Sequence, residues 1–386
     1  MFSVADLLAA DVRKHRLIKA MSITKTYLAD IIFTGNEILK QHAVVTENNI
    51  IITIKPVNEI PPGENIVEYK NTLIAPAFID LQLYGAHKRL LSVLPDATTV
   101  KAIYDYSKAG GASHCMPTLG TSTYETIFKC IDAIKDYWNA GGQGVLGLHV
   151  EGPWISVAKR GAHNPEWIFS PTIEQAKELL EYGKGVIKMI TIAPEVVNET
   201  LIDLVHSYNV VVSAGHTNAT YEQATTSFNT IRTATHLYNA MSALQHREPG
   251  MVGAVLDHAS VFCSIVPDGY HVNFPAIRIA KKIMDKRLFA ITDAVTETDE
   301  GYYQHTLDGD KYTANGILSG SALTMNKCLK NFVDHCDINI EEALRMCSLY
   351  PAQVMNMENE LGYILEGRKT NMVVLDESLN MITTIT

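Results

Sequence analysis

The sequence predicts an α/β protein, a (β/α)8 TIM-type barrel joined to a small β-sandwich domain that is built from both chain ends. Between residues 73 and 360, short apolar runs alternate with helical patterns, which is typical of βα units and a parallel sheet. The chain ends carry short β-like runs separated by Gly, Asn and Pro. The alternative, an open doubly wound sheet, usually has a GxGxxG turn directly after an early strand, and none of the early runs is followed by one.

We expect the chain to divide into three parts: an N-terminal extension over residues 1–20, the small β-sandwich over 21–72 and 361–386, and the barrel over 73–360. In residues 1–20, apolar positions at roughly helical spacing are interrupted by charges, which indicates an amphipathic segment. A second methionine, Met21, precedes the first strand-like run. Three interpretations of the extension therefore stay open: a native extension, an artefact of start choice and a docking helix.

Each expected barrel strand is a short apolar run bounded by turn-forming residues. Eight such runs occur, at residues 73–83, 113–119, 144–150, 185–192, 209–215, 230–235, 261–267 and 287–292. Helical patterns such as TIEQAKELLEYG and FPAIRIAKKIMDK lie between several of them. Eight alternations favour a closed barrel, in which functional residues gather at the carboxyl ends of the strands.

Composition argues against several classes of partner. The formal net charge of the 386 residues is -10, and Lys and Arg form no cluster interleaved with aromatic residues, so we expect no nucleic acid partner. No apolar run is long enough to span a bilayer, so we expect no membrane partner either. The six cysteines form no CxxC pair, which indicates reduced thiols and a cytoplasmic protein.

Polar residues end several of the predicted strands. LGLHVEGP leaves Glu151 at its end, VVVSAGHTNAT leaves His216, IRTATHLYNAM leaves His236, and LFAITDAV leaves Asp293. One such histidine alone is usually structural, but two imidazoles and a carboxylate at one barrel mouth are the His2Glu set of a catalytic zinc site. Asp293 is placed to take a proton from an attacking water. The pattern predicts hydrolysis of a polar carbonyl bond.

Eight motifs, in their order along the chain, carry a family resemblance: PAFIDLQLYG, HVEGPW, RGAHNP, SAGHTNATYEQA, ATHLYNAMSALQHREPG, DGYH, ITDAV and GILSGSALTM. Together they resemble the N-acetylglucosamine-6-phosphate deacetylases of the amidohydrolase superfamily, from about Met21 to about Asp376. GHTNA with THLYNAM and an EGP strand end is a specific combination. The resemblance implies release of acetate from N-acetyl-D-glucosamine 6-phosphate, which leaves glucosamine 6-phosphate.

The resemblance also implies roles for individual residues. The metal ligands would be Glu151, His216 and His236, which the strand ends also select. Asp293 would be the catalytic acid and base, and His163 would polarise the acetyl carbonyl. The implied substrate contacts are Ala162 to the sugar, Asn239, Ala240, Arg247 and His271 to the phosphate end, and a closing loop formed by Leu318, Ser319 and Gly320.

FIDLQLYGAH departs from a common pattern, because Gln82 and Tyr84 stand where many metal-dependent amidohydrolases have the His-x-His of a second metal. We therefore expect one divalent ion per subunit, Zn²⁺, although Fe²⁺, Mn²⁺ and Co²⁺ suit the same ligands. Gln82 would form a hydrogen-bonding wall of the substrate pocket, and Tyr84 would fill the volume of the missing metal. For His149, on the strand face of Glu151, we expect a structural role. For Asp80 a strand-end hydrogen bond and a catalytic role stay open.

The expected partner is a small phosphosugar, bound by a homodimer or homotetramer in which Arg247 reaches a neighbouring active site. Three other functions stay open: deacetylation of another hexosamine phosphate such as N-acetylgalactosamine 6-phosphate, hydrolysis of a cyclic amide or nucleobase, and a non-catalytic scaffold. The phosphate-end motif counts against the cyclic amide. The presence of all three metal ligands and the base counts against the scaffold.

Overall fold

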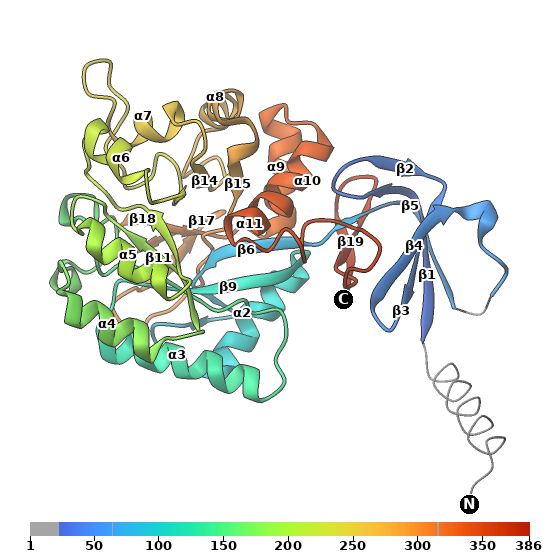
Figure 1. The fold of residues 1–386 in the computed structure, drawn as a ribbon, viewed down its shortest axis with the longest axis horizontal. Helices are drawn as coiled ribbons and strands as arrows, with labels where there is room; N and C mark the ends of the chain where they lie inside the picture. Colours follow the sequence, from blue (N-terminus) through green and yellow to red (C-terminus); the bar gives the residue numbers. More distant parts are fainter. Residues whose placement is uncertain (1–22, 64, 315) are drawn as a thin grey trace, which may run out of the picture.

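The computed structural model describes residues 23–63, 65–314 and 316–386, which form a barrel and a smaller sheet beside it (Figure 1). The first described strands, in blue, and the last ones, in red, meet in the smaller sheet. The extension predicted over residues 1–20 lies outside the described residues, so its role stays a prediction.

The barrel is an eight-stranded parallel sheet in which neighbours in the chain are neighbours in space. Its strands are β6 (Phe78–Leu83), β9 (Ala112–Gly120), β10 (Leu148–Glu151), β11 (Ile187–Ile192), β12 (Val211–Ala214), β13 (Thr233–Ala234), β14 (Phe262–Ile265) and β15 (Leu288–Ala290). The ring closes where Leu83 bridges Ala294 and the Asp293 N–H donates to the Gln82 carbonyl at 2.9 Å. Each predicted run overlaps one of these strands, so the predicted barrel is confirmed.

Helices cover the outside of the barrel because each has one apolar face. In α4, for example, Ala176, Leu179 and Leu180 are buried, and a capping box between Thr172 and Gln175 starts the helix. The helices are α2 (Ala97–Ala109), α3 (Tyr124–Asn139), α4 (Ile173–Tyr182), α5 (Glu199–Ser207), α6 (Tyr221–Ser227), α7 (Gly250–Asp257), α8 (Phe274–Met284), α9 (Met325–Cys336), α10 (Ile340–Cys347) and α11 (Leu349–Val354). Within the described residues, none is long and apolar enough to cross a membrane.

Both chain ends form one seven-stranded mixed sheet with the order β20-β19-β5-β1-β3-β4, and β2 pairs with β1. Its strands are β1 (Thr24–Phe33), β2 (Ile38–Lys40), β3 (His42–Glu47), β4 (Ile50–Pro56), β5 (Ile66–Pro76), β19 (Met372–Asp376) and β20 (Met381–Ile385). A bridge between Ile50 and Lys369 brings its far edge back towards the C-terminal segment. The sheet thus encloses an apolar core of its own, which includes Ile32, Val44 and Val374.

The single strand predicted over residues 73–83 is wrong, because the structure contains two strands there. Residues up to Pro76 continue β5, which pairs with β1 and β19 in the small sheet. After Ala77, β6 begins the barrel and pairs with β9. The apolar run is continuous because all residues from Leu73 to Leu83 are buried, so hydrophobicity gives no sign of the change of sheet.

Smaller strands lie between β15 and α9. A three-stranded antiparallel sheet, which we call the flap sheet, contains β16 (His305–Asp308), β17 (Lys311–Ala314) and β18 (Ile317–Ser321). Its last strand is bridged to the barrel by Ser321 and Ala294. A hairpin of β7 (Gly85–Ala86) and β8 (Arg89–Leu90) follows β6.

All six cysteines are buried and unpaired, as reduced thiols require.

Candidate active site

Four polar residues meet at the carboxyl-terminal mouth of the barrel. Glu151 is the last residue of β10, and His216, His236 and Asp293 follow β12, β13 and β15 within three residues. These last three have left-handed backbones, with φ of 49°, 41° and 55°. Such a conformation costs a residue with a side chain roughly 1–2 kcal/mol. The turn aims each side chain into the mouth, and such strain is frequent at functional sites.

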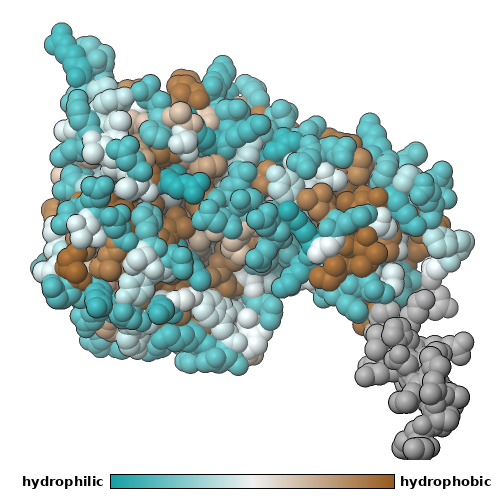
Figure 2. Space-filling view, viewed as in Figure 1, coloured by the Kyte–Doolittle hydropathy of each residue, from teal (hydrophilic) through white to brown (hydrophobic). Residues whose placement is uncertain are grey.

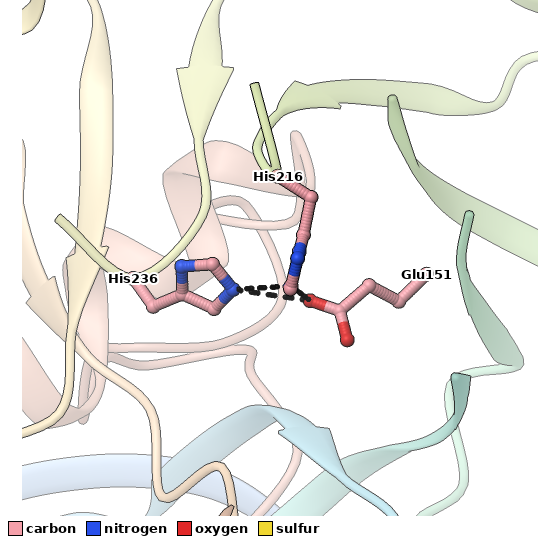
Figure 3. A group of neighbouring side chains, drawn as sticks. All are labelled: Glu151, His216 and His236. Carbon is pink, nitrogen blue, oxygen red and sulfur yellow. Dashed lines mark hydrogen bonds and ion pairs between the residues drawn. The ribbon is translucent and has the colours of Figure 1, made fainter. Parts of the chain in front are cut away.

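The His2Glu residues face one another across this mouth (Figure 3). The Glu151 Oε1 atom lies 3.3 Å from His216 Nε2 and 3.2 Å from His236 Nε2, and the two imidazole nitrogens are 3.1 Å apart. Ligand atoms about 2.0–2.1 Å from a tetrahedral zinc lie roughly 3.3 Å from one another. The spacing of these three atoms therefore fits one small divalent cation.

The protonation states of His216 and Glu151 suit metal binding. His216 Nδ1 lies 3.0 Å from the Lys159 carbonyl, which can only accept, so the proton is on Nδ1 and the Nε2 lone pair faces Glu151. Burial, reinforced by the neighbouring His163, lowers the pKa of His216 and favours this neutral form. Burial acts to raise the pKa of Glu151, but the facing imidazoles, His216 foremost, hold it well below its usual range. Burial acts to lower the pKa of His236, but the Glu151 carboxylate raises it above its ordinary value. A metal binds neutral imidazoles and an ionised carboxylate, so a cation would displace a proton held by His236.

Gln82 and Tyr84 connect the carboxylates of the mouth. The Gln82 amide nitrogen lies 2.9 Å from both Glu151 Oε1 and Asp293 Oδ1, and it lies 2.7 Å from the Tyr84 hydroxyl. The Tyr84 hydroxyl in turn donates to Glu151 Oε2. A neutral amide and a phenol thus lie between two carboxylates, where a second cation would need its own ligands. Burial raises the pKa of Asp293, and the nearby His236 opposes this shift.

His163 approaches the other side of Glu151, with Nε2 at 3.3 Å from Oε2. Its Nδ1 lies 3.2 Å from the backbone N–H of Thr121 and 2.7 Å from the Thr121 hydroxyl. Because a backbone N–H can only donate, Nδ1 accepts and the proton of the neutral ring lies on Nε2. His163 therefore presents an N–H donor at the barrel mouth.

A cavity of about 230 Å³ opens at this mouth. Of the site residues predicted from the sequence, all line this cavity except Gln82 and Arg247: Glu151, Ala162, His163, His216, His236, Asn239, Ala240, His271, Asp293, Leu318, Ser319 and Gly320. Tyr84 also lines the cavity. His271 is oriented by Asp268, whose Oδ2 lies 2.6 Å from His271 Nδ1. The structure thus brings the predicted metal, sugar and phosphate positions to one place.

Two predicted substrate contacts lie elsewhere in this chain. Gln82 is 1% exposed and lies behind the carboxylates rather than along the cavity. Arg247 is exposed on the loop between β13 and α7, which projects from the barrel at the upper left of Figure 1 and as a hydrophilic tip in Figure 2. Arg247 does not line the cavity of its own chain, so its phosphate role stays a prediction.

Asp80 and His149 make buried hydrogen bonds below the site. Asp80 accepts from the Thr292 hydroxyl and from the backbone N–H groups of Thr292 and Gln82. His149 lies between the Leu81 carbonyl at 3.1 Å and the Thr191 hydroxyl at 2.8 Å. Neither lines the cavity, so both hold strands together, as the structural interpretation expects.

The cavity wall also contains buried residues that the sequence did not point to, among them Tyr303 and His305, which are 9% and 5% exposed. Tyr303 comes from the segment between β15 and the flap sheet, His305 is the first residue of β16, and neither follows a barrel strand. The only signal is composition: the aromatic and imidazole-rich stretch YYQH interrupts an acidic, polar loop.

Comparison with known proteins agrees with this geometry. Residues 73–386 match the amidohydrolase family, and residues 30–67 match the NagA composite domain. The chain is 34% identical to N-acetylglucosamine-6-phosphate deacetylase of Haemophilus influenzae over 92% of this chain and 96% of that protein. It is 29% identical to N-acetylgalactosamine-6-phosphate deacetylase of Escherichia coli O157:H7, over 89% of this chain and 93% of that protein.

A crystal structure of N-acetylglucosamine-6-phosphate deacetylase from Pasteurella multocida superimposes with a TM-score of 0.90 at 30% identity, covering 94% of this chain and 98% of that one. The family match spans the barrel and the C-terminal segment, and the relatives are matched over nearly their whole length. The chain therefore belongs to the amidohydrolase family and, within it, to the N-acetylglucosamine-6-phosphate deacetylases.

Proposed function

We propose that this chain hydrolyses the N-acetyl group of N-acetyl-D-glucosamine 6-phosphate to give D-glucosamine 6-phosphate and acetate. The observation that carries the proposal is the convergence in one cavity of a His2Glu set, a carboxylate and an imidazole N–H donor. Relatives that carry this activity in their names are 34% and 30% identical over almost the entire chain.

Glu151, His216 and His236 would hold one divalent cation, for which we propose Zn²⁺. Two imidazoles and one carboxylate are the ligand set of many catalytic zinc sites, and Fe²⁺, Mn²⁺ and Co²⁺ accept the same donors. When bound, the ion supplies Lewis-acid chemistry, since it acidifies a water and polarises the acetyl carbonyl. The amidohydrolase family itself implies a divalent metal.

Asp293 would move the proton. Its Oδ1 accepts from Gln82 at 2.9 Å, which leaves Oδ2 to take a proton from the attacking water. The same carboxyl group would then give this proton to the amide nitrogen, because without it the nitrogen would have to leave as an anion. The raised pKa of Asp293 supports both steps, because it makes the carboxylate a better base towards water and lets the carboxyl group keep the proton until it passes to the nitrogen.

His163 would stabilise the oxygen of the tetrahedral intermediate through its Nε2–H. The tautomer inferred from Thr121 places this donor at the mouth without a proton transfer. One such donor contributes on the order of 3 kcal/mol when it is aimed at the developing oxyanion. Asn239, Ala240 and His271 line the same cavity and would bind the phosphate end, far from the reacting bond.

We further propose a homodimer or homotetramer in which Arg247 from a second copy completes the phosphate site. Its exposed position in this chain supports the idea, and guanidinium binds phosphate in a bidentate manner. Leu318, Ser319 and Gly320 of β18 would cover the bound sugar. A cytoplasmic location is part of the proposal, since phosphosugars are intracellular metabolites and all the cysteines are unpaired.

The decisive experiment measures acetate release from N-acetylglucosamine 6-phosphate and from its galactosamine epimer. Relatives named for the epimer are 29% identical, so it is the second candidate substrate. We expect kcat/KM to favour the glucosamine compound by about tenfold or more, a ratio within reach of one hydroxyl contact. A reversed ratio would assign the epimer. No acetate from either compound, after reconstitution with metal, would reject the proposal.

A further inference from the structure

We propose that Tyr303 is a positioning residue that holds His163 in its reactive orientation, acting through Thr121. The inference rests on the function proposed for His163 but adds a residue that no sequence motif marked. It concerns a segment outside the strand ends, the stretch between Asp293 and β16.

Tyr303 is buried beside His163 and bonded to the residue that orients it. Its hydroxyl donates to the Thr121 carbonyl at 2.7 Å. Its ring meets the His163 ring edge-on, with centroids 6.1 Å apart and an angle of 79°. A Cβ added to Gly120 would lie 3.6 Å from both the Tyr303 hydroxyl and His163 Cε1, so the two side chains share one wall.

Thr121 transmits this contact to the imidazole. Its N–H and hydroxyl both approach His163 Nδ1, at 3.2 and 2.7 Å, and its hydroxyl also lies 3.3 Å from the Glu151 carbonyl. The position of one backbone N–H decides which nitrogen of His163 carries the proton. Because Tyr303 anchors the carbonyl of the same residue, it fixes the direction from which Thr121 meets Nδ1.

The same segment is tied to the flap sheet. The His305 ring lies nearly parallel to that of Tyr303, with centroids 6.5 Å apart. His305 Nε2 lies 3.1 Å from the hydroxyl of Ser319, one of the residues expected to cover the sugar. A continuous chain of contacts therefore joins the cover of the cavity to His163. Tyr303 is the link between His305 and His163.

Replacement by phenylalanine separates positioning from packing. Y303F keeps the ring and its contact with His163 but removes the bond to Thr121. Tyr302→Phe is the matched control, since Tyr302 is adjacent, 37% exposed and outside the cavity lining. We would measure kcat, KM and metal content for both variants, for His163→Asn and for the double variant H163N/Y303F.

We expect Y303F to lower kcat roughly tenfold with KM within about twofold and metal content unchanged, and the control to match wild type. In the H163N background, Y303F should change kcat by less than about twofold, because its target is already gone. Wild-type kcat in Y303F, or a tenfold loss that persists on top of H163N, would overturn the proposal.

A spectroscopic readout does not depend on turnover, so it separates failure of this proposal from failure of the proposed function. Two-bond ¹H–¹⁵N spectra of histidine-labelled protein report which ring nitrogen carries the proton, and H163N identifies the His163 signals. We expect a single Nε2–H form in wild type and in the Tyr302 control, and a mixture of tautomers in Y303F. Identical tautomers in Y303F and wild type would contradict the role of Tyr303.

Discussion

At the scale of single residues, the two oxygens of Glu151 have different neighbours. Oε1 faces His216, His236 and the Gln82 amide, whereas Oε2 faces the Tyr84 hydroxyl and His163. One oxygen is thus available to a cation, and the other accepts a hydrogen bond from the Tyr84 hydroxyl. The arrangement favours a ligand that uses one oxygen, and it leaves Asp293 Oδ2 as the free carboxylate atom beside the cation site.

Asp293→Asn tests this division of labour. Asparagine keeps the shape of the side chain and an oxygen for Gln82, but it cannot accept the water proton. We expect kcat to fall on the order of 10³-fold, within the usual range for loss of a general acid and base, while metal content and substrate Kd stay near wild type. A variant that keeps more than about a tenth of wild-type kcat would remove Asp293 from the mechanism.

At the scale of elements, the catalytic geometry depends on how the first and last barrel strands meet. Asp80 of β6 accepts hydrogen bonds from the Thr292 hydroxyl and N–H, one residue before Asp293. Burial raises the pKa of Asp80 to about 7, although the bonds from Thr292 oppose this shift. The junction therefore carries a buried carboxyl that ionises near neutrality and relies on these donors.

Thr292→Val should destabilise the protein by roughly 2 kcal/mol, because a buried acceptor loses its hydroxyl partner. The folded protein holds the Asp80 proton to a higher pH than the unfolded chain does, so this carboxyl costs stability as pH rises from about 4 to about 7. The hydrogen bond from the Thr292 hydroxyl stabilises the ionised form of Asp80 more than its protonated form. Its loss should therefore destabilise the protein more at pH 8 than at pH 5. Urea unfolding measures it, and Thr292→Ser is the control. Equal losses for Val and Ser, or a larger loss at pH 5, would contradict the account.

Much of the arrangement of elements could be predicted from the sequence, since apolar runs separated by helical patterns located all the barrel strands. Four residues of the mouth were predictable because the carboxyl ends of all barrel strands lie on one face of the barrel: Glu151, His216, His236 and Asp293. The change of sheet at Ala77 was not, since burial continues unbroken through it. Tyr303 was missed because a loop has no period from which a facing direction can be read, and His305 because it begins β16, a short strand outside the alternating barrel pattern.

At the scale of the whole molecule, we propose that Arg247 of a second copy completes the phosphate site, and its exposed position on the loop before α7 is compatible with this role. Arg247→Ala should raise KM for the phosphorylated sugar roughly 10- to 100-fold, the usual loss for a charged hydrogen bond, with little effect on an unphosphorylated analogue. An equal effect on both substrates would contradict the phosphate role.

A mixed dimer provides a sharper test of the contact between copies. A heterodimer of one Arg247→Ala chain and one Asp293→Asn chain has one site with both residues intact, if the arginine crosses over. Such a heterodimer should regain roughly half of the wild-type kcat with wild-type KM. Activity no greater than that of the two parent variants would show that Arg247 does not act across an interface.

The central claim is a single-metal deacetylase site made by Glu151, His216 and His236, with Gln82 and Tyr84 in place of a second ion's ligands. The most direct test is elemental analysis of protein purified without added metal, together with acetate release from N-acetylglucosamine 6-phosphate before and after chelation. We expect about one equivalent of divalent metal per chain, with activity lost on chelation and restored by reconstitution. Two equivalents, or acetate release that survives complete removal of metal, would contradict it.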